Sequence, residues 1–117
     1  MQLEARKNLE DVRSAGALVQ EFVKGCDFDS YVSDRMRRAA VERQFEIMGE
    51  ALNRLSSTAP QVAERISNCQ RVIGFRNILI HGYDAVDDAI VWDIIRTYLP
   101  LLQNEVEGLL DLELPTS

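Results

Sequence analysis

Residues 34–55 carry the pattern that most limits the fold. Apolar side chains recur there at alternating steps of four and three residues, which matches the turn of an α-helix and not the two-residue repeat of a strand. The main stripe consists of Val41, Phe45, Met48, Leu52 and Leu55. A second stripe beside it consists of Ala40, Ile47 and Ala51. Together they make the apolar face wider than one partner helix requires, so we expect part of it to contact a second subunit.

Two more amphipathic helices flank this one in the sequence. Residues 3–24 form the first, which Gly25 should end because glycine favours the position after a helix. The last helix begins after the motif, where Asp84, Asp87 and Asp88 supply the acidic groups that suit a helix N-terminus. Pro100 should kink this helix or divide it in two.

Shorter helices are expected between the helix over residues 34–55 and the last helix. Pro60 suits the first turn of a short helix, and Asn68 can cap a longer one over residues 69–81. The chain shows no strand alternation, internal repeat or long linker. It therefore predicts one all-α domain over residues 1–117, an antiparallel bundle of four or five helices, with residues 111–117 as a frayed tail.

Composition argues against several classes of protein. No apolar run approaches the ~20 residues of a membrane span, and no signal-peptide pattern opens the chain. Cys26 and Cys69 form no C-x-x-C pair, so free thiols in a reducing compartment are expected. Two scattered cysteines and one histidine also make a poor zinc site. We therefore expect a cytoplasmic protein that has no membrane contact, binds no metal and needs no cofactor.

The positive charge of this acidic chain is concentrated in one segment. The formal net charge is −6, which by itself argues against nucleic-acid binding. Residues 35–76, however, contain eight arginines and four glutamates, a net charge of +4. Arginine suits bidentate contacts with phosphate better than lysine does. The segment is either a phosphate-binding surface or an ordinary solvated helix face.

The end of the helix over residues 69–81 places polar side chains within an apolar run. Asn77 and His81 are four residues apart, so they share one helical face and lie within hydrogen-bond reach. Arg76 and His81 are five apart, about 140° around the helix. They can act on one atom only through the long arginine stem, an unwound last turn or a two-fold dimer. Gly82 should end the helix, since it can adopt a positive φ.

These side chains also have purely structural explanations. His81 could be a buried histidine bonded to a nearby amide or carbonyl. Arg76 could form an ion pair with Glu46 or Glu50 of the long helix before it. The hydroxyl of Tyr83 could cap the end of the motif helix. Taken alone, Arg76 is best explained by the ion pair.

The spacing of Arg76, His81 and Tyr83 resembles the Arg-x4-His-x-Tyr motif of HepT-like toxins, a group within the HEPN superfamily. The similarity extends to residues 38–55 and 81–95 and covers nearly the whole chain. It implies a HEPN-type helical bundle that acts as a metal-independent endoribonuclease toxin, with Arg76 and His81 as catalytic residues. It also implies an antitoxin partner, an MNT-type nucleotidyltransferase that transfers AMP to Tyr83. In the active site Tyr83 would position phosphate.

Metal-free RNA cleavage needs a base for the 2′-hydroxyl proton, an acid for the leaving 5′-oxygen and a cation for the phosphorane charge. Histidine titrates near neutral pH and can serve either proton role, while arginine supplies a fixed positive charge. One chain holds a single histidine. Both histidine roles can be filled only if two chains combine, so activity and homodimerisation form one hypothesis.

Three side chains would support the catalytic pair. Asn77 would orient His81 or contact phosphate. Glu46 and Glu50 are four residues apart on one helical face, where they could hold Arg76 or tune His81.

Two other functions remain open. In the first, the bundle is a non-catalytic module that docks a nucleotidyltransferase or a nucleotide, with Arg76 and His81 as anion ligands. In the second, it is a helical interaction protein in which His81 is structural.

Overall fold

The computed structural model describes residues 1–112, apart from the side chain of Tyr83. Every regular element in these residues is helical, which confirms the predicted all-α bundle. The elements are α1 (Leu3–Val23), α2 (Phe28–Ser33), α3 (Arg35–Thr58), α4 (Pro60–Ala63), α5 (Cys69–His81), the 3₁₀ turn η1 (Tyr83–Ala85), α6 (Asp88–Asp93), the π-helical segment η2 (Ile94–Tyr98) and α7 (Leu99–Leu112). None of these helices is both long enough and apolar enough to cross a membrane.

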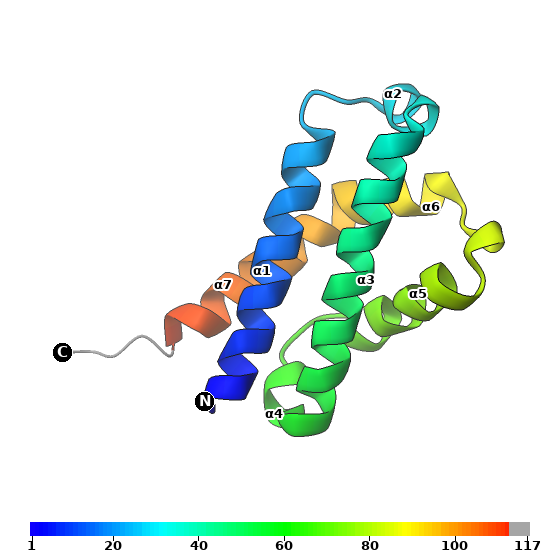
Figure 1. Ribbon diagram of the computed structural model, residues 1–117. Helices are drawn as coiled ribbons and strands as arrows, with labels where there is room; N and C mark the ends of the chain where they lie inside the picture. The colour runs from blue at the N-terminus through cyan, green and yellow to red at the C-terminus, as the bar shows by residue number, and fades with distance from the viewer. Residues whose placement is uncertain (113–117) are drawn as a thin grey trace.

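The bundle is built around α3 (Figure 1). α1 lies antiparallel to α3 on one side, and α5 crosses α3 on the other. The C-terminal run of α6, η2 and α7 passes behind these helices, with α7 against α1. The short α2 closes one end, between the end of α1 and the start of α3. α5 thus packs mainly against α3.

Both apolar stripes of α3 are used inside the chain. All five residues of the main stripe are at most 1% exposed. Ala51 of the second stripe is fully buried, and Ile47 is partly buried against the core. α3 needs this wide apolar face because it packs against α1 on one side and α5 on the other. The width of the face therefore does not by itself indicate a second subunit.

α5 has the bounds that the sequence predicts, but its ends have different backbone conformations from those expected. Gly82 follows the helix with a φ of −134°, so the predicted positive φ is wrong. Its N–H donates to the carbonyl of Ile78 at 2.8 Å, and the chain turns directly into η1. Asn68 precedes the helix with a φ of 58° and makes no side-chain capping bond. Asn68 therefore serves as a left-handed turn residue, a conformation that asparagine tolerates better than most residues.

The last helix is divided just before Pro100. Proline has no N–H for the carbonyl four residues earlier, so the regular hydrogen-bond ladder cannot continue through it. In the π-helical segment before it, the N–H of Leu99 bonds to the carbonyl of Ile94 instead, five residues back. This wider turn lets the chain continue as α7 with little change of direction (Figure 1).

α7 extends further than the sequence indicated. It runs through Leu112, so residues 111 and 112 are helical although we expected them in a frayed tail. Leu109 and Leu110 are buried, which gives the last turn of the helix a reason to persist. The rest of the predicted tail, residues 113–117, lies outside the described residues.

Candidate active site at the end of α5

Arg76 lies on the face of α5 that packs against α3. Its half-buried stem passes over Gly49 of α3, where the two helices are too close for another side chain to fit. The Nε atom is buried and has no hydrogen-bond partner within the described residues. The arginine therefore leaves the helix interface with only the tip of its guanidinium free to bond.

The tip of Arg76 turns towards the side of the helix that carries His81. Nη1 of Arg76 donates a hydrogen bond to Oδ1 of Asn77 at 3.1 Å. At 3.6 residues per turn, Asn77 is about 100° around the helix from Arg76 and about 40° from His81. The bond therefore draws the positive charge part of the way across the 140° that separate the catalytic candidates. We had expected Asn77 to orient His81 or contact phosphate; its described hydrogen bond is to Arg76.

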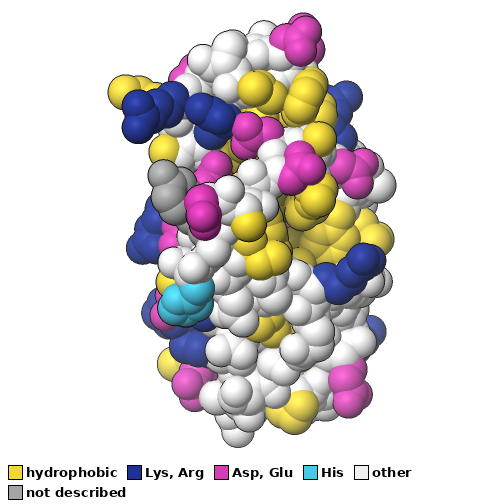
Figure 2. Space-filling view, turned by 90° about the vertical axis from the view of Figure 1, so that its right-hand side faces the viewer, with side chains coloured by type: hydrophobic (Ala, Val, Ile, Leu, Met, Phe, Trp, Pro, Cys, Tyr) yellow, Lys and Arg dark blue, Asp and Glu magenta, His cyan; other side chains and the backbone are white. Residues whose placement is uncertain are grey.

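His81 is the last residue of α5, and its side chain is exposed. No described residue forms a hydrogen bond with it. The buried structural histidine that we considered from the sequence is therefore absent. Figure 2 shows the histidine, in cyan, at the surface of the molecule.

The two carboxylates considered as partners of Arg76 are used differently. Glu50 accepts a hydrogen bond from Nη1 of Arg54 at 3.0 Å, so it does not hold Arg76. Glu46 forms no ion pair with Arg76 or His81 among the described residues. Within that part of the chain, Arg76 has no carboxylate partner, and the structural ion pair suggested by the sequence is not formed.

Tyr83 follows the helix at the first position of η1. Its backbone is therefore two residues beyond His81 in the chain. Its side chain lies outside the described part of the structure. The three roles considered for it, helix cap, phosphate contact and AMP acceptor, stay predictions.

The arginine-rich segment contains two kinds of arginine. Arg37, Arg38 and Arg54 form ion pairs with carboxylates. A second set is exposed and forms no ion pair within the described residues; it consists of Arg35, Arg43, Arg65 and Arg71. Part of the segment is thus an ordinary paired helix surface, and part is available for anions. In the same described residues no group of three or more histidine, cysteine or acidic side chains could hold a metal ion.

An apolar groove of about 690 Å³ runs along the other flank of α5. It separates α5 from the C-terminal run, and Figure 2 shows hydrophobic side chains gathered across this face. Its walls include Arg71, Phe75 and Ile78 of α5 and Ile90, Asp93 and Leu101 opposite them. Ile78 and Ile90 are 48% and 57% exposed, which is high for large aliphatic residues. The sequence did not reveal this groove, because it depends on where α5 lies relative to the C-terminal run.

Gly49 was also missed from the sequence. Its only sequence signal is a glycine within a strongly helical stripe, where alanine would form a better helix. A glycine inside a helix can mark a close approach of two backbones, but the sequence cannot name the partner. The structure identifies that partner as Arg76.

A family model described as ribonuclease HepT-like matches residues 12–109. A Methanocaldococcus jannaschii protein named as a candidate RNase is 34% identical over 101 residues, covering 85% of this chain and 90% of the relative. A Thermococcus cleftensis protein named as a candidate ribonuclease HepT is 30% identical over 101 residues, covering 86% and 91%. No solved structure matches the chain. With a family match over most of its length and relatives of the same kind, the chain belongs to the HepT-like ribonuclease family.

Proposed function

We propose that the protein is an endoribonuclease that cleaves RNA without a metal ion, using Arg76 and His81. The observation that carries this proposal is the state of Arg76. Its guanidinium lacks a carboxylate partner among the described residues and is turned by Asn77 towards the face of His81. An uncompensated positive charge on the same helix as an exposed imidazole suits a phosphate diester. The RNase names of the relatives support the same substrate class.

The reaction is a transesterification within the RNA strand. His81, as a neutral imidazole, takes the proton of the 2′-hydroxyl, and the 2′-oxygen attacks the adjacent phosphorus. Arg76 stabilises the negative charge that develops on the phosphorane oxygens. The bond from phosphorus to the 5′-oxygen then breaks, and an acid supplies the proton that the leaving oxygen needs. The products are a 2′,3′-cyclic phosphate and a 5′-hydroxyl.

The second proton role motivates a homodimer. Each chain has one histidine, so a second imidazole can come only from another copy. The apolar groove beside α5 supports this proposal, because exposed Ile78 and Ile90 give a second copy an apolar surface close to the site. A two-fold contact there would bring two copies of α5 together.

We further propose that a nucleotidyltransferase antitoxin silences the enzyme by transferring AMP to Tyr83. The new phosphodiester would place negative charge and bulk beside Arg76 and His81, where RNA phosphate must bind. Incubation with such a transferase and ATP should add one or more AMP masses, and Tyr83→Phe should prevent the addition. Modification that persists in Tyr83→Phe would assign the acceptor to another residue.

Cleavage of RNA in EDTA tests the proposed activity. The unmodified protein should cut RNA and leave 2′,3′-cyclic phosphate ends, while DNA, which lacks the 2′-hydroxyl, should stay intact. His81→Ala should lower the rate by roughly 10²-fold or more and leave the protein folded, because the side chain is exposed. A wild-type protein that binds RNA or a nucleotide but never cleaves would favour the non-catalytic module. Cleavage that survives His81→Ala in contaminant-controlled preparations would disprove this mechanism.

Mixing inactive variants tests the dimer. Light scattering at micromolar concentration should give about twice the chain mass of 13.3 kDa. If each active site combines residues of both chains, mixed Arg76→Ala and His81→Ala proteins should recover part of the cleavage that neither shows alone. A strictly monomeric protein that cleaves RNA would remove the argument for a composite site.

A further inference from the structure

Gly49 marks the closest approach between α3 and α5. A Cβ atom at this position would lie 2.4 Å from Cβ of Arg76, 3.0 Å from its Cγ and 3.2 Å from the carbonyl oxygen of Val72. The other glycines differ: a Cβ added at any of them would come no closer than 3.5 Å to another group. Among the glycines of the described residues, only Gly49 has a neighbour so close that it leaves no room for a side chain.

That neighbour is a catalytic candidate. The stem of Arg76 is fixed by its contact with the bare backbone at Gly49, and its tip is fixed by the hydrogen bond to Asn77. The buried Nε between these two restraints has no hydrogen-bond partner in the described residues that could hold it elsewhere. The position of the guanidinium thus depends on the α3–α5 contact as much as on α5 itself.

An alanine at position 49 would displace this arrangement. Ordinary van der Waals contact with a Cβ begins at 3.4 Å, so Arg76 or the whole of α5 would have to move by about 1 Å. The nearest atom is a Cβ, which moves with the backbone, and not the far end of a flexible side chain. A displacement of that size at a catalytic group can lower a rate by about 10²-fold.

We infer that Gly49 is a positioning residue for RNA cleavage: by lacking a side chain, it sets where the guanidinium of Arg76 lies relative to His81. This inference rests on the proposed function, because it assigns Gly49 to the same reaction. Gly49 itself contacts no substrate. Its effect passes mainly through Arg76, the nearest neighbour of a Cβ at this position.

The first experiment compares Gly49→Ala with Gly108→Ala. Gly108 lies in α7, away from the site, and a Cβ there meets nothing within 4 Å. Both variants improve helix propensity equally, so they differ only in the contact with α5. At a temperature where both are folded, Gly49→Ala should lower kcat by about tenfold to a hundredfold with little change in KM, and Gly108→Ala should match the wild type. A folded Gly49→Ala protein with wild-type kcat would overturn the inference.

The second experiment does not depend on activity. The effect of Gly49→Ala on the urea midpoint is measured in the wild type and in an Arg76→Gly background, which lacks the clashing Cβ. The midpoint should fall in the wild type, and most of that shift should disappear in Arg76→Gly. Equal shifts in both backgrounds would show that Arg76 is not the group displaced. If the wild type cleaves no RNA, the proposed function fails, while this comparison still decides whether Gly49 sets the position of Arg76.

Discussion

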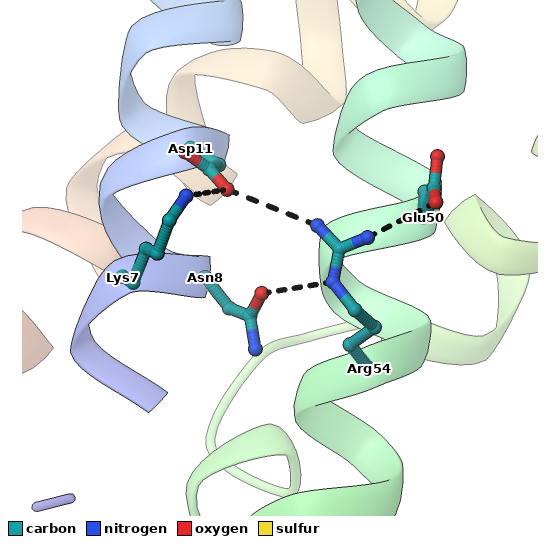
Figure 3. A network of polar contacts seen from close by, with 5 residues as sticks. All are labelled: Lys7, Asn8, Asp11, Glu50 and Arg54. Atoms are coloured by element: carbon teal, nitrogen blue, oxygen red, sulfur yellow. Dashed lines mark hydrogen bonds and ion pairs between the residues drawn. The ribbon is translucent and has the colours of Figure 1, made fainter. Parts of the chain in front are cut away.

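Two arginines, Arg54 between α1 and α3 and Arg76 between α3 and α5, are surrounded in opposite ways. Nε of Arg54 donates to Oδ1 of the buried Asn8 at 3.2 Å, and Nη1 donates to Glu50 at 3.0 Å (Figure 3). Its Nη2 lies 3.8 Å from Asp11, which also accepts from Lys7 at 3.3 Å. Carboxylates thus compensate the charge of Arg54 on two sides.

Arg76 has a neutral partner instead. Its one described hydrogen bond goes to the amide oxygen of Asn77, and its Nε is buried without a partner in the described residues. The charge of Arg54 is neutralised by its own chain, whereas the charge of Arg76 is oriented but not neutralised. A cation held in this way is suited to bind an anion from solution, which is the role proposed for Arg76.

The largest expected effect is on activity at Arg76. Arg76→Ala should lower the rate of RNA cleavage by roughly 10²-fold or more, because it removes the charge proposed to stabilise the phosphorane. The free energy of unfolding should change by less than about 1 kcal/mol, since no ion pair of the described residues is lost. Cleavage assays and urea unfolding on the same preparation measure both. A loss of folding that accounts for the loss of activity would make Arg76 structural, like Arg54.

Arg54→Ala should give the opposite result. The free energy of unfolding should fall by about 1–3 kcal/mol, because the buried Asn8 loses its partner. Cleavage per folded molecule should stay near the wild-type rate. Arg43→Ala is the matched control on α3, since Arg43 is exposed and has no ion pair within the described residues; its stability should change by about 0.5 kcal/mol or less. A strong loss of cleavage in folded Arg54→Ala would contradict the distinction between the two arginines.

Replacing the side-chain amide of Asn77 by a carboxylate should make the surroundings of Arg76 resemble those of Arg54. Asn77→Asp places a carboxylate where the amide oxygen now accepts from Arg76, so the guanidinium would be neutralised as that of Arg54 is. We expect cleavage to fall by about tenfold, the effect of roughly 1.4 kcal/mol on the transition state. Asn77→Ala frees the guanidinium without neutralising it, so it should lower the rate of cleavage by less than Asn77→Asp does. Equal rates for the two variants would mean that the charge of the partner does not matter.

The smallest expected effect concerns Glu42, whose negative charge is only partly compensated by its neighbours. Burial, followed by repulsion from Asp88, raises the pKa of Glu42 above its usual 4.5. Arg38 lowers it less, since its Nη1 pairs with Asp88 at 3.1 Å. The folded state therefore binds this proton more tightly than the unfolded state. The stability that the protonated form contributes is present below pH 4.5 and is lost as the pH rises through the folded pKa.

Glu42→Gln removes this titration. It should flatten the pH dependence of the unfolding free energy just above pH 4.5 and raise stability at neutral pH by about 0.5 kcal/mol or less. Urea unfolding over a pH series measures both quantities, and Glu64→Gln, which alters an exposed carboxyl, provides the control. An unchanged pH profile would show that Asp88 and Arg38 already balance the charge of Glu42.

Local sequence determined the helices and the chemistry available to them. The spacing of apolar residues in α3 follows from the helical turn alone, so both stripes and the bounds of α5 were predictable. The motif side chains were visible for a similar reason, because a histidine and an arginine near a helix end are read directly from residue order. The resemblance to HepT-like toxins then predicted a function for those residues.

Tertiary structure decided how those side chains are used. Gly49 faces Arg76, Glu50 pairs with Arg54, and the second apolar stripe of α3 packs inside the chain. None of these facts follows from periodicity, because each depends on which helix lies opposite and at what distance. A helix pattern specifies a face but not its neighbour. For an arginine, the groups that surround it in the fold decide whether its charge is neutralised by the chain itself or stays available to a substrate.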